Sequence, residues 1–500
     1  MSDIVSGFPK NLAYNLKKLD AGFSKTKVKI IPDNKKVEPN GIQRYRLTGN
    51  GLYDFRTLCL FGDASCSTAT ANRNVHFPRF SSSVIENISI TANNTTLCSI
   101  NCYNFLYNML MDIEGADISQ YSKRQSAGEW YDPSIKYEYV NANGADTTNQ
   151  ALKTTLAVQN SAGTGGASAD SKVPFCVNNW LGFFGSMSTP VIDLSDFGDV
   201  YINIQYAPAS ILFDANLTTV GNTALTDATY NIDDMFMTID RISFQDPLYY
   251  NLKTEKLLSP EGLSVAYYDY FYSAFSSVQK SSTVSLTWNI NSASLDQILV
   301  SYRHANYTAT RPLILYGANS LSTGTNAMSF LRVLSQIDAF ENTASDANAF
   351  SGTTNLGDAF NQSIYFMRSG ASFKNSTFAI NSVNIDPYAL TPIEVFNKVL
   401  QYTGFQNLDL GSSGLHAGCL SLYHFLKYYF VDICDLTNIS GDNQWWISGL
   451  DGRGSGINIS YTANFDTANT QSVFPIAFCR STRHLRINAG RQITIDPPPL

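Results

Sequence analysis

The chain has 500 residues, of which 44% are hydrophobic and 15% charged, and its net charge is −7. A single hydrophobic core rarely grows beyond about 250–300 residues, so this length predicts two or three domains. The many Asn, Ser, Thr, Gly and aromatic residues favour strands and turns, which argues against a helical bundle or a doubly wound α/β fold.

Residues 1–36 form a basic segment. Its eight lysines outnumber three aspartates, so the segment has a net charge of +5. The rest of the chain then has a net charge of −12, since the total is −7. Such an arm on an acidic body is typical of a segment that contacts an anionic polymer or a membrane surface. Two alternatives stay open, a partly disordered solubilising terminus and a short amphipathic helix of Leu12, Leu16 and Leu19 that docks elsewhere. The lysines of the arm are Lys10, Lys17, Lys18, Lys25, Lys27, Lys29, Lys35 and Lys36.

Residues 37–246 are expected to form a first β unit. Strand-like patterns run over 42–60, then a long polar tract follows at about 115–171, which we interpret as an exposed excursion. Residues 200–206 alternate apolar and polar side chains as a sandwich strand does, and 235–244 alternate again.

Residues 247–500 are expected to form a second unit, reached by a crossing at 247–264. Alternation at 284–290, a strand at 298–302 and a polar excursion at 305–362 with a short helical pattern near 330–334 follow in order. Beyond a helix-like stretch at 420–430, we expect strands at 457–461 and 474–478 and a closing pair at 485–487 and 493–495. Pro497, Pro498 and Pro499 end the fold.

One structural pattern occurs in both halves, about 295 residues apart. In the first half Ile88 and Ile90 alternate along a strand, and a helical face recurs at every third residue, at Leu97, Ile100, Tyr103 and Leu106. In the second half Val383 and Ile385 take the place of the strand, followed by Leu390, Ile393, Phe396 and Val399, with Asn397 in the position of Asn104. Each pattern precedes a tryptophan segment, Trp180 or Trp445 and Trp446. We interpret the chain as two tandem antiparallel jelly rolls of about eight strands each.

The sequence offers no convergent set of catalytic, cofactor-binding or metal-binding residues. Eight scattered cysteines are expected to be reduced and mostly buried, and no paired Cys or His knuckles accompany them. Residues 1–20 lack the apolar core of a secretory signal, and no window has the roughly 18 apolar residues that a membrane span needs, so we expect synthesis and assembly inside a cell. The cysteines are Cys59, Cys66, Cys98, Cys102, Cys176, Cys419, Cys434 and Cys479, and the histidines are His76, His304, His416, His424 and His484.

Three further features have a chemical interpretation and a structural one. The glycine-rich run 449–456 resembles a phosphate cradle but lacks a lysine and a βαβ context, so a turn is favoured. Asp233 and Asp234 could serve glycoside hydrolysis, although no aromatic platform lies near them in the sequence. The tryptophans could stack on sugars or bases, but their recurrence in both halves favours packing.

Several segments resemble the double jelly-roll major capsid proteins of polinton-like viruses, adintoviruses and virophages, in the PRD1–adenovirus lineage. In the first half the resemblance rests on 78–90, 103–112, 180–184, 190–194 and 198–208, and in the second on 376–383, 390–396 and 445–454. It covers about residues 40–495. The resemblance implies an all-β double jelly roll whose homotrimer is a pseudo-hexameric capsomer in the icosahedral shell of a double-stranded DNA virus.

The resemblance also implies partners and a location. The chain would contact itself, neighbouring capsomers, and penton and minor capsid proteins, and it would reside in the virion. Its lysine arm would point inward, toward genomic DNA or an internal membrane. The polar excursions would form the outer crown and the clasps between subunits. Two other classes stay open: a glycan-processing or carbohydrate-binding protein, and an attachment protein outside the shell.

Overall fold

The structure is a computed structural model that describes residues 23–69, 74–78, 80–114, 160–163, 166–167, 173–214, 226–244, 247–259, 262–280, 283–305, 307–308, 363–370, 372–402, 422, 425–426, 429–437, 449–453, 456–466, 472–490 and 492–496. The polar excursions, the helical pattern near 330, Trp445, Trp446 and the closing prolines lie wholly or mostly outside these ranges.

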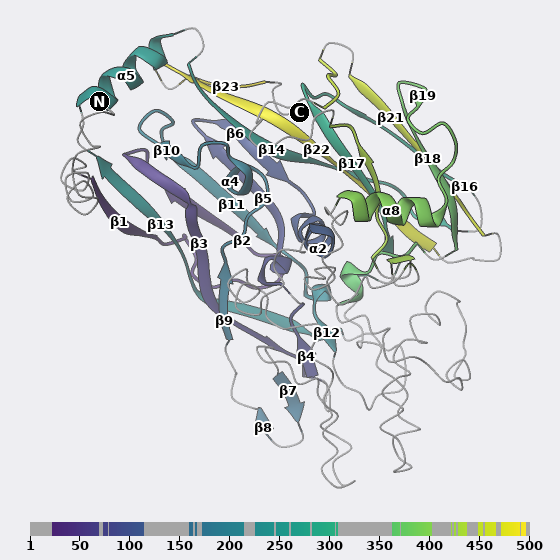
Figure 1. Cartoon of the computed structure of the whole chain (residues 1–500). Helices are drawn as coiled ribbons and strands as arrows, with labels where there is room; N and C mark the ends of the chain where they lie inside the picture. Colours follow the sequence, from purple (N-terminus) through teal and green to yellow (C-terminus); the bar gives the residue numbers. More distant parts are fainter. Residues whose placement is uncertain are drawn as a thin grey trace, which may run out of the picture.

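The first unit is a sandwich of two antiparallel sheets (Figure 1). One sheet has the order β1 (Phe23–Ile30), β13 (Thr229–Phe244), β3 (Leu52–Ser67) and β10 (Val191–Asp193), with β9 (Val173–Val177) also paired to β3. The other has the order β2 (Ile42–Leu47), β11 (Val200–Tyr206), β5 (Ile85–Ala92) and β6 (Thr95–Ile100).

Short elements complete the first unit. A small sheet joins β12 (Phe213–Asp214), β4 (Asn74–His76), β7 (Asn160–Gly163) and β8 (Gly166–Ala167). The helices are η1 (Ser81–Val84), α2 (Tyr103–Glu114), α4 (Phe183–Ser186) and η3 (Ala209–Ile211). The expected crossing to the second unit begins with the helix α5 (Pro247–Leu258).

The second unit repeats the architecture. Its first sheet has the order β14 (Leu263–Ala274), β22 (Ser472–Asn488), β17 (Leu295–His304) and β20 (Asp432–Asp435), and β15 (Val278–Gln279) and β23 (Gln492–Asp496) also pair with β22. Its other sheet has the order β16 (Thr283–Ile290), β21 (Ile457–Phe465), β18 (Phe373–Ile380) and β19 (Val383–Asn384). The described helices here include η5 (Ile364–Phe366) and α8 (Pro392–Tyr402).

The two units share one strand order. If the eight principal described strands of each unit are numbered along the chain, one sheet reads 1-8-3-6 and the other 2-7-4-5 in both units. This is the order in which a long antiparallel hairpin folds over into two packed sheets, and it defines a jelly roll. In both units a helix, α2 or α8, follows the fifth strand.

Alternating burial explains why these segments are strands. In β11 the inward residues Val200, Ile202, Ile204 and Tyr206 are buried while their neighbours are partly exposed, and β16 alternates in the same way. Burying each such side chain contributes about 1.5–3 kcal/mol. All residues of β17 are buried, because one of its faces covers the core of its own roll and the other meets the first roll.

The repeated strand–helix pattern is present, but its expected register is wrong in two places. Val383 and Ile385 belong to β19 and the turn after it, and the counterpart of β5 is β18. Leu97 and Ile100 lie in β6, so the helix begins only at Tyr103, and Asn104 and Asn397 fall about one turn apart in their helices.

Two-residue turns account for the first of these errors. Asn93 and Asn94 join β5 to β6, and Asn381 and Ser382 join β18 to β19, all four with positive φ. This is the backbone of a type I′ hairpin turn, which Asn favours. The expected strands at 474–478 and 485–487 are also one continuous strand, β22.

Candidate functional site

The two rolls meet along a seam of buried hydrogen bonds, ion pairs and aromatic contacts. Tyr267 of β14 donates its phenolic O–H to the carbonyl oxygen of Leu97 in β6, and its ring packs edge-on against Phe183, with centroids 5.0 Å apart. Ser186 and Ser188 of the first roll satisfy backbone groups of Tyr268 and Ala266, so the edge of β14 is closed.

A buried ion pair lies behind this contact. Arg483 Nε is 2.9 Å from Asp269 Oδ2, and the Cys98 thiol donates to Asp269 Oδ1 at 3.2 Å. Burial raises the pKa of Asp269, and Arg483 offsets only part of that effect. The charge pair therefore spans two strands of the second roll while a residue of the first roll contacts it.

A second polar cluster in the seam is centred on Arg303 of β17. Its guanidinium donates to Cys102 Sγ at 3.1 Å and lies 4.7 Å from the ring centroid of Phe105, both residues of the first roll. Nearby, the Tyr365 hydroxyl donates to Glu86 Oε2 at 2.7 Å. A cavity of about 540 Å³ opens between these groups.

A third contact joins α2 to the second roll. Arg368 Nη2 lies 2.7 Å from Asp112 Oδ2, and both side chains are almost fully buried. Phe105 of the same helix stacks on Phe478 of β22. Because buried charges are tolerated only when paired, these contacts fix one relative placement of the two rolls.

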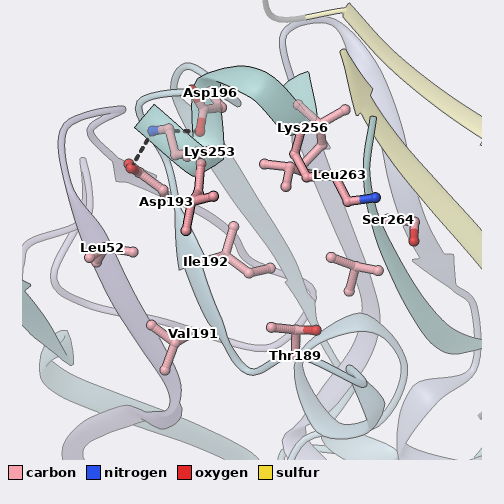
Figure 2. Close-up of a pocket in the computed structure, with 13 residues that line it drawn as sticks. Leu52, Thr189, Val191, Ile192, Asp193, Asp196, Lys253, Lys256, Leu263 and Ser264 are labelled. Carbon is pink, nitrogen blue, oxygen red and sulfur yellow. Dashed lines mark hydrogen bonds and ion pairs between the residues drawn. The ribbon is translucent and has the colours of Figure 1, made fainter. Parts of the chain in front are cut away.

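The helix α5 is anchored at the top of the seam. Figure 2 shows Lys253 between two carboxylates of the β10 segment, 2.6 Å from Asp193 and 2.8 Å from Asp196. Burial, the largest single cause, would lower the pKa of Lys253 and raise that of Asp193. The two carboxylates together nevertheless raise the pKa of Lys253, and Lys253 together with the Ser195 hydrogen bonds lowers that of Asp193. An apolar pocket of about 520 Å³ lies beneath this anchor, with Leu252 and Leu263 among its lining residues.

The predicted basic arm is partly built into the first sheet. Lys25, Lys27 and Lys29 lie on β1, an edge strand that pairs with β13 along its whole length. Lys25 Nζ is 2.8 Å from Asp240 Oδ2, and Lys29 Nζ lies 3.8 Å from the Phe236 ring centroid.

The remaining lysines of the arm divide into two groups. Lys35 and Lys36 follow β1, and Lys36 pairs with Glu38 at 2.9 Å. Lys10, Lys17 and Lys18 lie outside the described residues, as do Leu12, Leu16 and Leu19. The inward orientation of the arm therefore stays a prediction.

The described cysteines and possible metal ligands do not form a chemical site. None of the described cysteines forms a disulfide, and burial raises the pKa of Cys102 to about 11 and that of Cys434 to about 12, which keeps these thiols protonated. No group of three His, Cys, Asp or Glu among the described residues is arranged to hold a metal ion. None of the described helices is long and apolar enough to cross a membrane.

The glycine-rich run and the aspartate pair also have local explanations. Leu450 exchanges both backbone hydrogen bonds with Leu295, and a Cβ on Gly449 would come within 1.8 Å of the Leu295 oxygen, so the run needs glycine for close packing. Asp233 and Asp234 lie inside β13 at a bulge, not beside a strand start, and Phe236 of the same strand stacks on Phe61. The Trp180 indole is buried and donates to the Leu58 carbonyl at 2.9 Å, which makes it a packing residue.

Comparison with known proteins gives matches among solved structures. PBCV-1 VP54, as fitted into a reconstruction of the virophage Sputnik, matches with a TM-score of 0.53 and 11% identity over 95% of this chain and 97% of that chain. The Faustovirus major capsid protein matches with 0.52 and 9% over 94% and 91%. The Sputnik virophage structure matches with 0.50 and 10% over 95% and 89%. No family model and no curated protein matches the chain.

These likenesses and the shared strand order confirm the predicted fold, two tandem antiparallel jelly rolls. The structural neighbours include virophage capsid structures, one of the groups that the sequence segments resemble.

Proposed function

We propose that the chain is a major capsid protein that assembles as a homotrimer and tiles the icosahedral shell of a double-stranded DNA virus of the polinton-like virus, adintovirus or virophage type. The observation that carries the proposal is the repetition of one jelly-roll strand order in a single chain whose two rolls are held together by a buried polar seam.

Duplication has a geometric purpose in such a shell. Three chains with two similar rolls each present six similar walls, so a threefold assembly can contact six neighbours in a hexagonal lattice. Closed rings of this kind are built from head-to-tail contacts that repeat until the ring closes. A rigid seam is useful here because a loose hinge between the rolls would spread the six walls over many orientations.

The role is structural rather than enzymatic in this proposal. The charged side chains of the seam have protein partners, since Asp269 pairs with Arg483 and the Arg303 guanidinium donates to Cys102 Sγ. The basic segment would face the particle interior, with Lys10, Lys17 and Lys18 toward genomic DNA, an internal membrane or minor capsid proteins. The protein would reside in the virion after assembly inside the host cell.

Light scattering coupled to size exclusion tests the proposal. A trimeric capsomer has three times the chain mass of 55.1 kDa. Electron microscopy of particles assembled from the purified protein should then show capsomers with six lobes on a hexagonal lattice. A strictly monomeric protein that never forms particles contradicts the proposal.

A further inference from the structure

The internal repeat pairs each surface of one roll with a counterpart on the other. β6 and β19 are both the outer strand of the second sheet, and each is followed by a helix, α2 or α8. β14 and β1 are both the outer strand of the first sheet, each paired to the last long strand of its roll. Surfaces that are equivalent in the fold can therefore be compared for burial.

Within the chain, β6 and α2 are covered by the second roll, and β14 is covered by the first. Leu97 of β6 and Phe105 of α2 are fully buried, and Tyr267 of β14 is 1% exposed. The seam thus joins the β6–α2 face to the first sheet of the second roll, in which β14 is the edge strand and β22 and β17 also make contact.

The counterparts β19 and α8 are not covered in this way. In the β19–α8 face, which we define by Val383, Ile385, Tyr388 and Ile393, the exposed fractions are 66%, 41%, 58% and 50%. Four large apolar side chains so close in the sequence and so exposed are typical of an interaction surface.

The β1 edge is uncovered as well. Its residues from Ser24 to Lys27 are exposed, and so is Lys29, whereas in β14 only Ser264 and Ala274 are exposed. An edge strand with unpaired backbone groups is a ready surface for another chain, and lysines on it limit unspecific pairing. In Figure 1, β1 and α8 lie on opposite sides of the molecule, so one chain cannot bring these two surfaces together.

We propose that the β19–α8 face of one chain is covered by the β1 edge of a second copy, in the same manner as the β6–α2 face is covered by the β14 edge within a chain. The inference rests on the proposed self-assembly and names the surfaces that make it. The contact is head-to-tail, and it continues the seam around the ring.

Charge supports this occupant. The β1 edge exposes Lys25, Lys27 and Lys29, and the opposing face carries Glu394, whose carboxylate accepts from Thr391 and Tyr388 at the exposed start of α8. The cationic β1 edge and the anionic start of α8 attract each other when the ring closes. Two β1 edges, or two α8 starts, repel each other.

Charged substitution of the apolar face tests the assignment. Ile393→Asp places a carboxylate in the contact and should raise the trimer dissociation constant about tenfold or more, because it removes an apolar anchor and buries a charge. Ile42→Asp is the matched control, since Ile42 is 71% exposed on β2 and belongs neither to the β19–α8 face nor to β1, and it should leave the trimer intact. Val383→Asp in β19 repeats the test at a second position.

Cross-linking tests the same contact without a mutation. A short amine-reactive cross-linker applied to the wild-type trimer should join Lys398 of α8 to lysines of β1, and Lys398–Lys27 or Lys398–Lys29 products should occur in the trimer and be lost at dilutions that give monomer.

The outcomes separate two failures. A wild-type protein that is monomeric at every concentration contradicts the proposed function. A wild-type trimer that survives both Ile393→Asp and Val383→Asp, or a trimer whose Lys398 cross-links avoid β1, overturns this inference and leaves the proposed function standing. Thermal unfolding of each variant shows whether its rolls are still folded. If a variant does not fold, the cross-links of the wild-type trimer decide whether the inference holds.

Discussion

Tyr267 of the second roll donates a buried hydrogen bond to the main-chain carbonyl of Leu97 in the first roll. The two residues are 170 positions apart in the sequence, and the bond closes the seam at the point where β14 meets β6. Its presence means that the two rolls share polar as well as apolar contacts, so that sliding one roll on the other would leave a buried carbonyl without its donor.

Tyr267→Phe should therefore destabilise the chain by about 1–3 kcal/mol, because the ring is kept while the Leu97 carbonyl loses its buried donor. Denaturant unfolding of the purified protein measures this loss. Tyr388→Phe removes a hydroxyl whose bond to Glu394 is exposed to water in the single chain, so at dilutions that give monomer it should change stability by much less. Equal effects of the two substitutions would contradict the role assigned to Tyr267.

The ion pair of Asp112 and Arg368 predicts a non-additive pair of substitutions. Asp112→Leu alone strands a buried guanidinium and should cost about 3–5 kcal/mol. Arg368→Met alone strands the carboxylate and should cost a similar amount, whereas the double variant should recover most of the loss. Unfolding free energies of the four proteins give the coupling. Additive losses would show that the two side chains do not interact across the seam.

The alternation of apolar residues predicted most of the strands, because each β-strand of a sandwich covers its own core with every second side chain. The seam could not be predicted in the same way. Arg303, Asp269 and Arg483 interrupt apolar strands and, in one roll alone, would point to solvent. Their burial depends on the neighbouring roll, which no local pattern reveals.

The register of the repeat was missed for a different reason. The repeat was matched on the spacing of apolar residues alone, which does not use the Asn-led dipeptide Asn381-Ser382 between two strands, a signal of a two-residue hairpin. The matching Asn93 and Asn94 in the first half offered the same signal. β1 and β14 also differ in sequence, because β1 carries Lys25, Lys27 and Lys29 whereas residues 265–272 of β14 are mostly apolar or aromatic, as is typical of a strand covered on both faces.

The basic segment predicts a separation between assembly and packaging. Deleting residues 2–22 leaves β1 in place, so the trimer should keep its mass while particles retain less DNA, because Lys10, Lys17 and Lys18 are gone. Deleting residues 2–36 also removes β1 and bares the β13 edge, so it should weaken the trimer itself. Light scattering and nucleic-acid content of purified particles measure the two effects. Loss of trimers on deletion of 2–22 would assign the arm to capsomer building.

The carboxyl of Asp432 predicts a pH dependence of stability. Asp432 is fully buried on β20, where Ser376 and Tyr461 both donate to its Oδ2. Burial raises its pKa to about 6, although the two hydroxyls lower it in part. The folded protein therefore binds a proton more tightly than the unfolded chain, in which an aspartate has a pKa near 3.9.

The sign follows from linkage. Stability contributed by this proton is fully present below about pH 4 and is lost as pH rises through about 6, at a cost on the order of 3 kcal/mol. Asp432→Asn keeps the two acceptor contacts without the proton, so its unfolding free energy should gain on that of the wild type between pH 4 and 7. Asp451→Asn is the control of opposite sign, because hydrogen bonds from Arg453 lower the pKa of Asp451 and its small contribution is lost as pH falls. If the difference between Asp432→Asn and wild type is the same at both pH values, the buried carboxyl is not titrating as its surroundings require.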